Sequence, residues 1–597
     1  MGALAAILFT QGPPDPDVAR HMQAAAPHRG LPLRSVTHGA CVLSVSLAAD
    51  RPDGWLAADG DLAAAVVGTL DNLPEVAATG PHQRADGAPD AAFVLITLFR
   101  AHGERAAHRL RGVFSGAVTD GKWLWVFRDH IGLSTLFYRQ DRRAAYVATE
   151  AKQVLAGAGL APAPDVPVLE RIFYGRLDDD TPCALRGVLR LPKASIARFG
   201  ESNGPLIRRY WEPETLLERA RPTAADVREQ FDRLMTQAVS RAINGPTAIS
   251  LSGGIDSCAV AAFAAPVYRR LTGRPLPALS AVFPDLPSVD ESPYIAMVVD
   301  ALQISLRTYR PAAERRDRLQ EWARLLDGPV PTVSISEIDE NYRLARRYGF
   351  RVLLTGELGE FVYDQRGHLL SHLLWRGRLR WLSGHVRRRR AAGASWKKIL
   401  MQFIPAVTPA RVALAYVAAR GLDKGARIPD WLDERKANET PYRDDLIAAP
   451  HDRWRRQQLL GFAGPGLTIE ADDVLASLHG IHVRRPLADV DLWEFFLGLP
   501  AEVKFPDHRS KTLVRQLLRA KIPDVILDRT DKTVFNEFAL AQIDYATLRR
   551  WLLKPAYRMP GVRYNVLAER LAREDFTLID LVWANDLARI HAFLAVW

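Results

Sequence analysis

Cysteine is scarce in this chain, because its 597 residues include only three, Cys41, Cys183 and Cys258. The three lie far apart in the sequence and have no spacing that is typical of a metal site. We therefore expect neither a disulfide framework nor a zinc site, and we expect a reducing, cytoplasmic compartment.

Long apolar runs are also missing. No stretch is long enough to span a bilayer, so the sequence predicts no membrane span. The opening MGALAAILFT has an apolar run but no basic region before it, which argues against a signal peptide. Ala6 stands where a myristoylation signal needs serine or threonine, and the chain contains no internal repeat.

What the chain does have is the composition of a globular protein with more than one core. It is 48% hydrophobic and 25% charged, and its length predicts two to four domains. The net charge of +11 suits acidic partners, which include phosphates, carboxylate-rich peptides, nucleic acid and membrane surfaces. The charge does not choose among them, and a nucleic-acid role, which rests on charge alone, is not expected.

The N-terminal third of the chain contains short alternating strands separated by turn residues. Strands are expected in residues 40–48, 62–70 and 122–129, and a helix is expected in residues 91–101. This pattern predicts an α+β domain dominated by antiparallel sheet.

A domain boundary is expected near residues 210–227, and we divide the chain into residues 1–212 and 213–597. Thr223 and Asp226 have the spacing of a capping box at the start of a helix. That helix carries apolar residues on one face: Val227, Phe231, Leu234, Met235, Ala238 and Val239.

Strands and helices alternate after this boundary. Strands are expected in residues 247–251, 278–283 and 350–356, which predicts a parallel sheet with crossover helices. From about residue 365 the chain is expected to be mainly helical. Its basic stretch HVRRRRAAGASWKK, residues 385–398, is interpreted as a solvated face or loop, with docking of an acidic peptide as the alternative.

The stretch SLSGGIDS, residues 250–257, lies between a strand pattern and an apolar helical run. Glycines let a backbone approach an anion, and loop amides at a helix N-terminus attract phosphate. Four residues are expected to hold phosphates: Ser252, Gly253, Gly254 and Ser257. Asp256 repels phosphate unless a cation lies between them, so we infer a bridging Mg²⁺. The Walker lysine motif is absent, and an ordinary glycine turn is the structural alternative.

This loop resembles the PP-loop of ATP pyrophosphatases, which cleave ATP between the α and β phosphates. Further segments resemble the asparagine synthetase branch of that family. LLTGELGEF (353–361) is similar to its second loop, HGIHVRRPLADVDLWEF (479–495) to a helical stretch, and DRTDKTVF (528–535) to its R-x-x-K-x-x-F motif. The resemblance implies an α/β synthetase domain with an extra helical region.

The resemblance also implies roles for individual residues. Lys532 matches the catalytic lysine, which stabilises charge at the α-phosphate. Glu360 stands where the family has its second magnesium-binding aspartate, and Glu357 is the candidate base. Arg484 is expected to orient a phosphate or the substrate carboxylate, with a structural ion pair as the alternative. The other residues expected at ATP are Leu251, Ile255, Val282, Thr355 and Gly356.

The N-terminal domain resembles the family's class II glutaminase domain, in residues 109–138 and 146–155. Glutaminases of this class use an N-terminal cysteine as nucleophile, but this chain opens with Met-Gly-Ala, and Cys41 lies in a strand pattern. Val67 stands in place of the oxyanion-binding asparagine, before Gly68. We therefore expect a degenerate glutaminase-like sandwich and no glutamine hydrolysis.

An enzyme of this kind without an ammonia source needs an amine that its substrate carries. Two subfamilies of this type are the β-lactam synthetases and the lasso-peptide cyclases. Three features favour the cyclase: Glu357 where β-lactam synthetases have tyrosine, the additional residues around 365–465, and the positive net charge.

The cyclase resemblance implies a reaction and a set of partners. ATP and Mg²⁺ would adenylate an Asp or Glu side chain of a precursor peptide, and the peptide's N-terminal amine would then close an isopeptide ring. A leader-peptide protease and a leader-binding protein are the expected partners. A small-molecule amide synthetase of the β-lactam synthetase type stays open as an alternative, as does a non-catalytic peptide-docking module.

Overall fold

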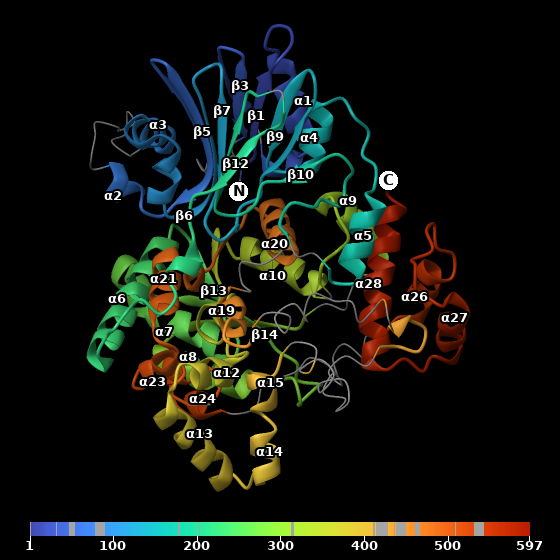
Figure 1. Ribbon diagram of the computed structural model, residues 1–597. Coiled ribbons are helices and arrows are strands. Elements are labelled where there is room, and N and C mark those ends of the chain that lie inside the picture. Colours follow the sequence, from blue (N-terminus) through green and yellow to red (C-terminus); the bar gives the residue numbers. More distant parts are fainter. Residues whose placement is uncertain are drawn as a thin grey trace.

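The structure is a computed structural model in which two differently built regions follow each other along the chain (Figure 1). The N-terminal region has two antiparallel sheets, and the C-terminal region surrounds one parallel sheet. The structure describes residues 2–30, 33–46, 54–77, 90–176, 179–201, 203–311, 316–332, 334–409, 412, 428–434, 436, 449–459, 466–507, 509–529 and 543–597.

Each antiparallel sheet of the N-terminal region has six strands, in the orders β10-β8-β9-β1-β3-β2 and β12-β11-β7-β6-β5-β4. The strands are β1 (Leu4–Phe9), β2 (Leu33–His38), β3 (Cys41–Ser46), β4 (Gly54–Asp59), β5 (Leu62–Leu70), β6 (Gly112–Thr119), β7 (Leu124–Arg128), β8 (Phe137–Gln140), β9 (Ala144–Ala148), β10 (Leu189–Arg190), β11 (Ser195–Phe199) and β12 (Leu206–Arg209).

The core of this region follows from the two-residue period of its strands. In β1, Leu4, Ala6 and Leu8 pack into the core between the two sheets, whereas Ala5 and Ile7 face the opposite side. The helices are α1 (Pro16–Ala24), α2 (Leu73–Ala77), α3 (Ala91–His102), α4 (Ala151–Gly157) and α5 (Val166–Phe173). The expected α+β fold is confirmed, with each expected strand and the expected helix in place.

The C-terminal region is built on a five-stranded sheet of order β15-β14-β13-β16-β17, in which every neighbouring pair is parallel. Its strands are β13 (Thr247–Ser250), β14 (Pro277–Ala281), β15 (Ser305–Tyr309), β16 (Val352–Leu354) and β17 (His482–Arg484). The chain leaves β13 toward β14 and later returns to place β16 on its other side. The crevice between β13 and β16 is therefore a topological switch point, where α/β sheets bind ligands.

Helices accompany this sheet. Six of them are α6 (Ala224–Ala242), α7 (Ile255–Thr272), α8 (Ser292–Leu302), α10 (Ile335–Arg347), α20 (Leu467–Leu478) and α28 (Leu578–Leu594). The predicted capping box of α6 is present, since Asp226 N donates to Thr223 Oγ1 at 3.2 Å and Thr223 N donates to Asp226 Oδ2 at 2.8 Å. In the described part of the chain, no helix is long and apolar enough to cross a membrane.

Further helices complete the region. They are α9 (Leu319–Leu326), α11 (Gly359–Tyr363), α12 (Leu369–Trp375), α13 (Leu379–Ala391), α14 (Trp396–Leu400), α15 (Ile404–Val407), α19 (Arg453–Gln458), α21 (Val490–Gly498), α22 (Ala501–Lys504), α23 (Thr512–Leu517), α24 (Asp524–Asp528), α26 (Tyr545–Leu552) and α27 (Tyr564–Arg573). The mainly helical content expected after residue 365 is confirmed for the described residues.

One detail differs from the sequence analysis. Residues 479–495, which resemble a helical stretch, contain strand β17, because this segment pairs with β16 and forms the edge of the sheet before α21 starts. The basic stretch at residues 385–398 is mostly exposed and largely helical, which agrees with a solvated face, since it includes the last turns of α13 and the start of α14.

Candidate active site

The stretch SLSGGIDS forms the turn between strand β13 and helix α7. The strand is buried in the sheet, and Gly254 is the N-cap of the helix. Gly254 N donates to Ser252 Oγ at 3.3 Å, and Ser252 N donates to Ser257 Oγ at 3.1 Å. Hydroxyl and amide groups of the loop therefore gather at a helix N-terminus, where the backbone attracts anions.

Two glycines after strand β16 let a second segment pack directly on this loop. A Cβ on Gly356 would lie 2.3 Å from Ser257 N, and a Cβ on Gly359 would lie 2.7 Å from Asp256 Oδ1. Any larger side chain at these two positions would push the segments apart. Glycine at both positions therefore brings the loops after β13 and β16 together.

The two loops border a cavity of about 530 Å³. A cavity of this size can take a small-molecule ligand or cofactor. Ten of the expected site residues line it: Ser252, Gly253, Gly254, Ile255, Asp256, Ser257, Thr355, Gly356, Glu357 and Glu360. The structure thus brings together the phosphate loop, the candidate base and both candidate metal ligands.

Other expected residues have different surroundings. Leu251 N donates to Leu279 O at 3.0 Å, and Val282 N donates to Tyr309 O at 2.9 Å. These two N–H groups are used within the sheet, so contact with a nucleoside would come from the carbonyl groups. Lys532 lies outside the described residues.

Arg484 and Arg485 are neighbours in sequence but have different partners. Arg484 Nη2 donates to Asp71 Oδ1 of the N-terminal domain at 2.5 Å, and the arginine side chain is only 7% exposed. Arg485 Nε donates to Glu357 Oε2 at 2.6 Å, and its Nη2 pairs with Asp472. This geometry favours the structural ion pair for Arg484 and places Arg485 at the site instead.

The candidate metal ligand Asp256 has two side-chain partners. Its Oδ2 accepts a hydrogen bond from Lys511 Nζ at 2.5 Å, and its Oδ1 accepts one from the Tyr363 hydroxyl. Burial raises the pKa of Tyr363 well above its usual value, so the phenol stays a hydrogen-bond donor. Lys511 and Tyr363 were missed by the sequence analysis because neither belongs to a motif that it used.

The carboxylate of Glu291 also holds the phosphate loop in place. Gly253 N donates to Glu291 Oε2 at 3.0 Å, and Arg529 Nη1 donates to Glu291 Oε1 at 2.8 Å. The Arg529 guanidinium also lies 4.1 Å from the ring centre of Tyr294. Arg529 is the first residue of the R-x-x-K motif, so the motif itself marked this position, although the sequence analysis assigned a role only to its lysine.

A second and larger cavity, of about 700 Å³, adjoins the first. The two share Ile338 and Glu357 in their linings. Residues of the N-terminal domain and of α28 also line the second cavity, among them Ile131, Phe173 and Ile590. Phe173 of α5 packs edge-on against Trp583 of α28, which holds these two elements side by side (Figure 1).

The sequence model of asparagine synthase matches residues 230–576, more than half of the chain. The chain belongs to the asparagine synthase family. The sequence model of the glutamine amidotransferase domain matches residues 3–211 of this family member.

Curated relatives of this asparagine synthase family protein are distant. Asparagine synthetase [glutamine-hydrolyzing] 3 of Bacillus subtilis (strain 168) is 25% identical over 71% of this chain and 67% of its own length. A putative asparagine synthetase [glutamine-hydrolyzing] of Mycobacterium bovis is 24% identical over 72% of this chain and 67% of its own length. The amidase chyE of Penicillium rubens is 31% identical, but over 30% of this chain and 27% of its own.

A solved structure of glutamine phosphoribosylpyrophosphate amidotransferase from B. subtilis, complexed with ADP and GMP, is similar in part. It aligns with a TM-score of 0.27 and 14% identity over 46% of this chain. This chain covers 65% of that structure, which is less than two thirds.

The glutaminase-like domain of this asparagine synthase family protein buries its cysteines. Burial raises the pKa of the Cys41 thiol to about 12, of Cys183 to about 11 and of Cys258, in the synthetase domain, to about 12. A thiol of this kind is protonated at neutral pH and is a poor nucleophile. Val67, which is expected from the sequence to stand at the position of the oxyanion-binding asparagine, is buried in the core between the two sheets.

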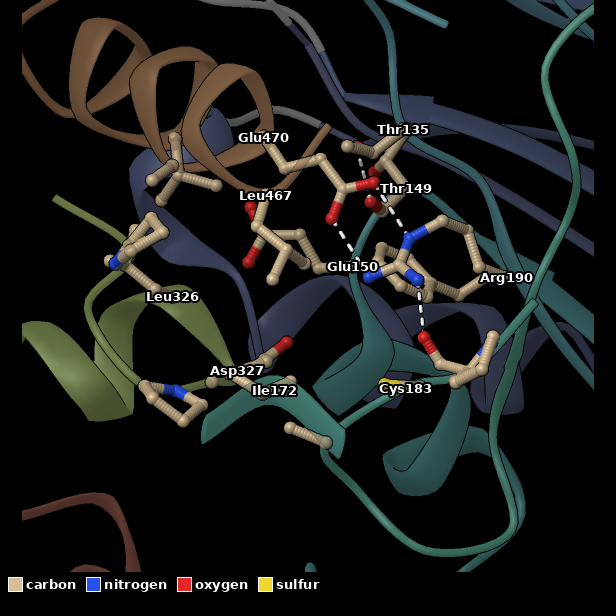
Figure 2. Close-up of a pocket in the computed structure, with 18 residues that line it drawn as sticks. Thr135, Thr149, Glu150, Ile172, Cys183, Arg190, Leu326, Asp327, Leu467 and Glu470 are labelled. Atoms are coloured by element: carbon tan, nitrogen blue, oxygen red, sulfur yellow. Dashed lines mark hydrogen bonds and ion pairs between the residues drawn. The ribbon is translucent and has the colours of Figure 1, made fainter. Parts of the chain in front are cut away.

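A small enclosed cavity of about 50 Å³ lies between the two domains of the asparagine synthase family protein (Figure 2). Figure 2 shows Glu470 of α20 directed at Arg190 of the glutaminase-like domain, and the two pair at 2.7 Å. Glu150 on the same cavity pairs with Arg29 and Lys152. The pair of Glu470 with Arg190 joins the two domains, as do the pairs of Arg29 with Asp473 at 2.7 Å and of Lys152 with Asp327 at 3.3 Å.

Proposed function

We propose that this protein is an ATP-dependent, AMP-forming amide ligase that closes an isopeptide ring in a precursor peptide. The observation that carries this proposal is the pair of adjoining cavities, one at the phosphate loop and one of about 700 Å³ beyond Glu357. A peptide segment would fill the second cavity, whose volume exceeds that of the cavity at the phosphate loop. Its lining mixes apolar side chains with charges, as a peptide-binding cavity requires.

The first step is adenylation of a side-chain carboxylate of the peptide. A carboxylate oxygen attacks the α-phosphorus of ATP, the bond to the β,γ-pyrophosphate breaks, and pyrophosphate leaves. The amides of Gly253 and Gly254 and the hydroxyls of Ser252 and Ser257 stand at the helix N-terminus that would receive the β and γ phosphates. Lys532 would stabilise the charge that develops at the α-phosphate.

The second step forms the amide bond. The peptide's N-terminal amine attacks the acyl carbon, AMP leaves with the electron pair of the broken C–O bond, and the amine gives up a proton. Glu357 lines both cavities and is the proposed base. Its ion pair with Arg485 at 2.6 Å fixes one carboxylate oxygen, so the other can face the amine. Overall, the peptide loses one water while ATP becomes AMP and pyrophosphate.

Divalent metal fits the donor set of the first cavity. Asp256 and Glu360 both line it, and hard oxygen ligands of this kind suit Mg²⁺, which takes one or two carboxylates together with substrate phosphates. In the described part of the chain, no group of three or more His, Cys, Asp and Glu residues is placed to hold a metal ion. The bound metal would neutralise phosphate charge, with the nucleotide supplying the remaining ligands.

We further propose that the glutaminase-like domain hydrolyses no glutamine and serves as a wall of the peptide cavity. None of the three cysteines in the chain has a thiol that is both accessible and easily ionised. Ile131, Ile172 and Phe173 of this domain line the second cavity. Glutamate release from glutamine that depends on this protein would contradict this part of the proposal.

The test is mass spectrometry of a candidate core peptide that contains Asp or Glu, with ATP and Mg²⁺, with and without the partner protease, while AMP is followed. Loss of one water from the peptide, matched by AMP, is the expected result. AMP without dehydration of the peptide would indicate a small-molecule amide synthetase of the β-lactam synthetase type. Neither signal, with the partner present, would indicate a non-catalytic peptide-docking module.

A further inference from the structure

The segment from residue 366 to residue 409 has an extreme charge balance. It contains ten Lys and Arg residues and no Asp or Glu. The whole chain has a net charge of only +11, so nearly all of its excess positive charge lies in this one segment. The segment forms helices α12, α13, α14 and α15.

The same segment exposes large apolar side chains. Trp375, Leu379, Trp396 and Leu400 are each more than half exposed, from 55% to 69%. Single exposed apolar residues are normal on a protein surface, but a group of them within 26 residues indicates a surface that contacts something apolar.

Helices α13 and α14 form a projection at the end of the molecule opposite the N-terminal sheets (Figure 1). The projection is anchored at its base, because Trp381 Nε1 donates to Phe505 O at 2.8 Å and Leu382 packs in a small core with Trp454. At its tip, the Arg390 guanidinium lies 5.2 Å from the ring centre of Trp396. The projection is therefore a fixed part of the fold that exposes cations and apolar side chains together.

The basic residues divide into two groups by position. Two near the base are paired, Arg376 with Glu218 at 3.2 Å and Arg378 with Glu502 at 3.1 Å. Farther out, Arg387, Arg388, Lys397 and Lys398 form no ion pair with a carboxylate in the described part of the chain. The unbalanced charge is thus concentrated at the tip.

We propose that the α13–α14 projection docks the protein on an anionic membrane surface. Lys and Arg attract anionic headgroups, while Trp and Leu enter the boundary between headgroups and acyl chains. An acidic peptide would also attract the cations. The exposed Trp396 and Leu400 favour a lipid surface over an acidic peptide, because apolar side chains beside cations suit the boundary between headgroups and acyl chains. This proposal does not depend on the proposed ligase activity.

The test is co-sedimentation of the full chain with vesicles of phosphatidylcholine alone and of phosphatidylcholine with phosphatidylglycerol. We expect binding to the vesicles that contain phosphatidylglycerol, and weaker binding as salt rises. The tip variant R387E/R388E/K397E/K398E is expected to lose at least about tenfold in affinity, since each basic residue near such a surface adds attraction. W396S/L400S is expected to weaken the binding that persists at high salt.

A matched control separates a local surface from net charge. R20E/R208E/R310E/R573E reverses the same number of exposed cations at other places, where the side chains are 63–68% exposed. This control variant should keep most of the binding to vesicles that contain phosphatidylglycerol. Equal loss in the control and tip variants, or no binding of the wild-type chain, would overturn the proposal. Binding of poly-glutamate but not of vesicles would overturn it in favour of an acidic peptide. Circular dichroism checks that each variant is folded.

Discussion

The cavity at the phosphate loop and the small cavity between the domains are both lined by charged side chains, but they use them differently. In the small cavity of about 50 Å³, Glu470 and Glu150 are satisfied by buried arginine and lysine. In the cavity of about 530 Å³, the carboxylates of Asp256 and Glu357 are paired as well, with Lys511 and Arg485, but they border an open volume together with loop amides and hydroxyls. Paired charges that only hold domains together need no open volume, whereas paired charges around one can meet a ligand.

The largest expected effect follows from removing the lysine of the R-x-x-K motif. Lys532→Ala should abolish AMP formation while the protein stays folded, because the α-phosphate loses its cation and such losses cost about 10²–10³ in rate. AMP release measured by chromatography, together with circular dichroism, checks this. Turnover above about a tenth of wild type would remove Lys532 from the catalytic assignment.

Asp256→Asn should have the next largest effect. The amide keeps the size of the side chain but loses the charge that would face a metal and that pairs with Lys511 at 2.5 Å. We expect turnover to fall by about tenfold or more and the Mg²⁺ concentration for half-maximal rate to rise. Titration of AMP formation with Mg²⁺ measures both. An unchanged Mg²⁺ dependence would place the metal elsewhere.

Arg485 and Arg484 give a matched pair of variants with adjacent positions and the same chemistry. Arg485→Lys should lower kcat by about tenfold, because a lysine cannot reproduce the fixed bond to Glu357. Arg484→Lys should leave kcat unchanged and lower only thermal stability, since its partner Asp71 joins the domains. A fall in kcat in Arg484→Lys but not in Arg485→Lys would show that Arg484 acts at the site.

These two arginines also show what sequence can and cannot predict. The phosphate loop was predictable because its serines, glycines and aspartate are contiguous and follow a strand pattern. Strand β17 ends at Arg484 and Arg485 follows it, so the sequence alone could not tell which of the two arginines faces the site. Lys511 and Asp256 lie 255 residues apart, and only the fold brings them together. Strands such as β5 and β13 and the helix α6 were predictable because each has a local apolar pattern, whereas β17 is only three residues long and was not.

Breaking the buried ion pairs between the domains should lower stability and leave turnover unchanged. Glu470→Gln removes the charge between buried Arg128 and Arg190 and is expected to cost about 3 kcal/mol of unfolding free energy. Thermal unfolding measures this, with AMP formation at low temperature unchanged. Glu75→Gln, which breaks an exposed pair with Arg241, should cost under about 1 kcal/mol. Loss of turnover in Glu470→Gln would mean that the two cavities are coupled.

Lys504 is a buried cation that lines neither of these two cavities. Its Nζ donates to Gln458 Oε1 at 2.9 Å, and burial lowers the pKa of its ammonium from 10.5 to about 7. Because the unfolded chain binds this proton between pH 7 and 10 and the folded chain does not, stability should rise with pH there, by up to about 1.4 kcal/mol per pH unit. Lys504→Met should remove that slope and raise the melting temperature at pH 7. Differential scanning fluorimetry across this range measures both, and a variant that keeps the wild-type slope would show that another group carries it.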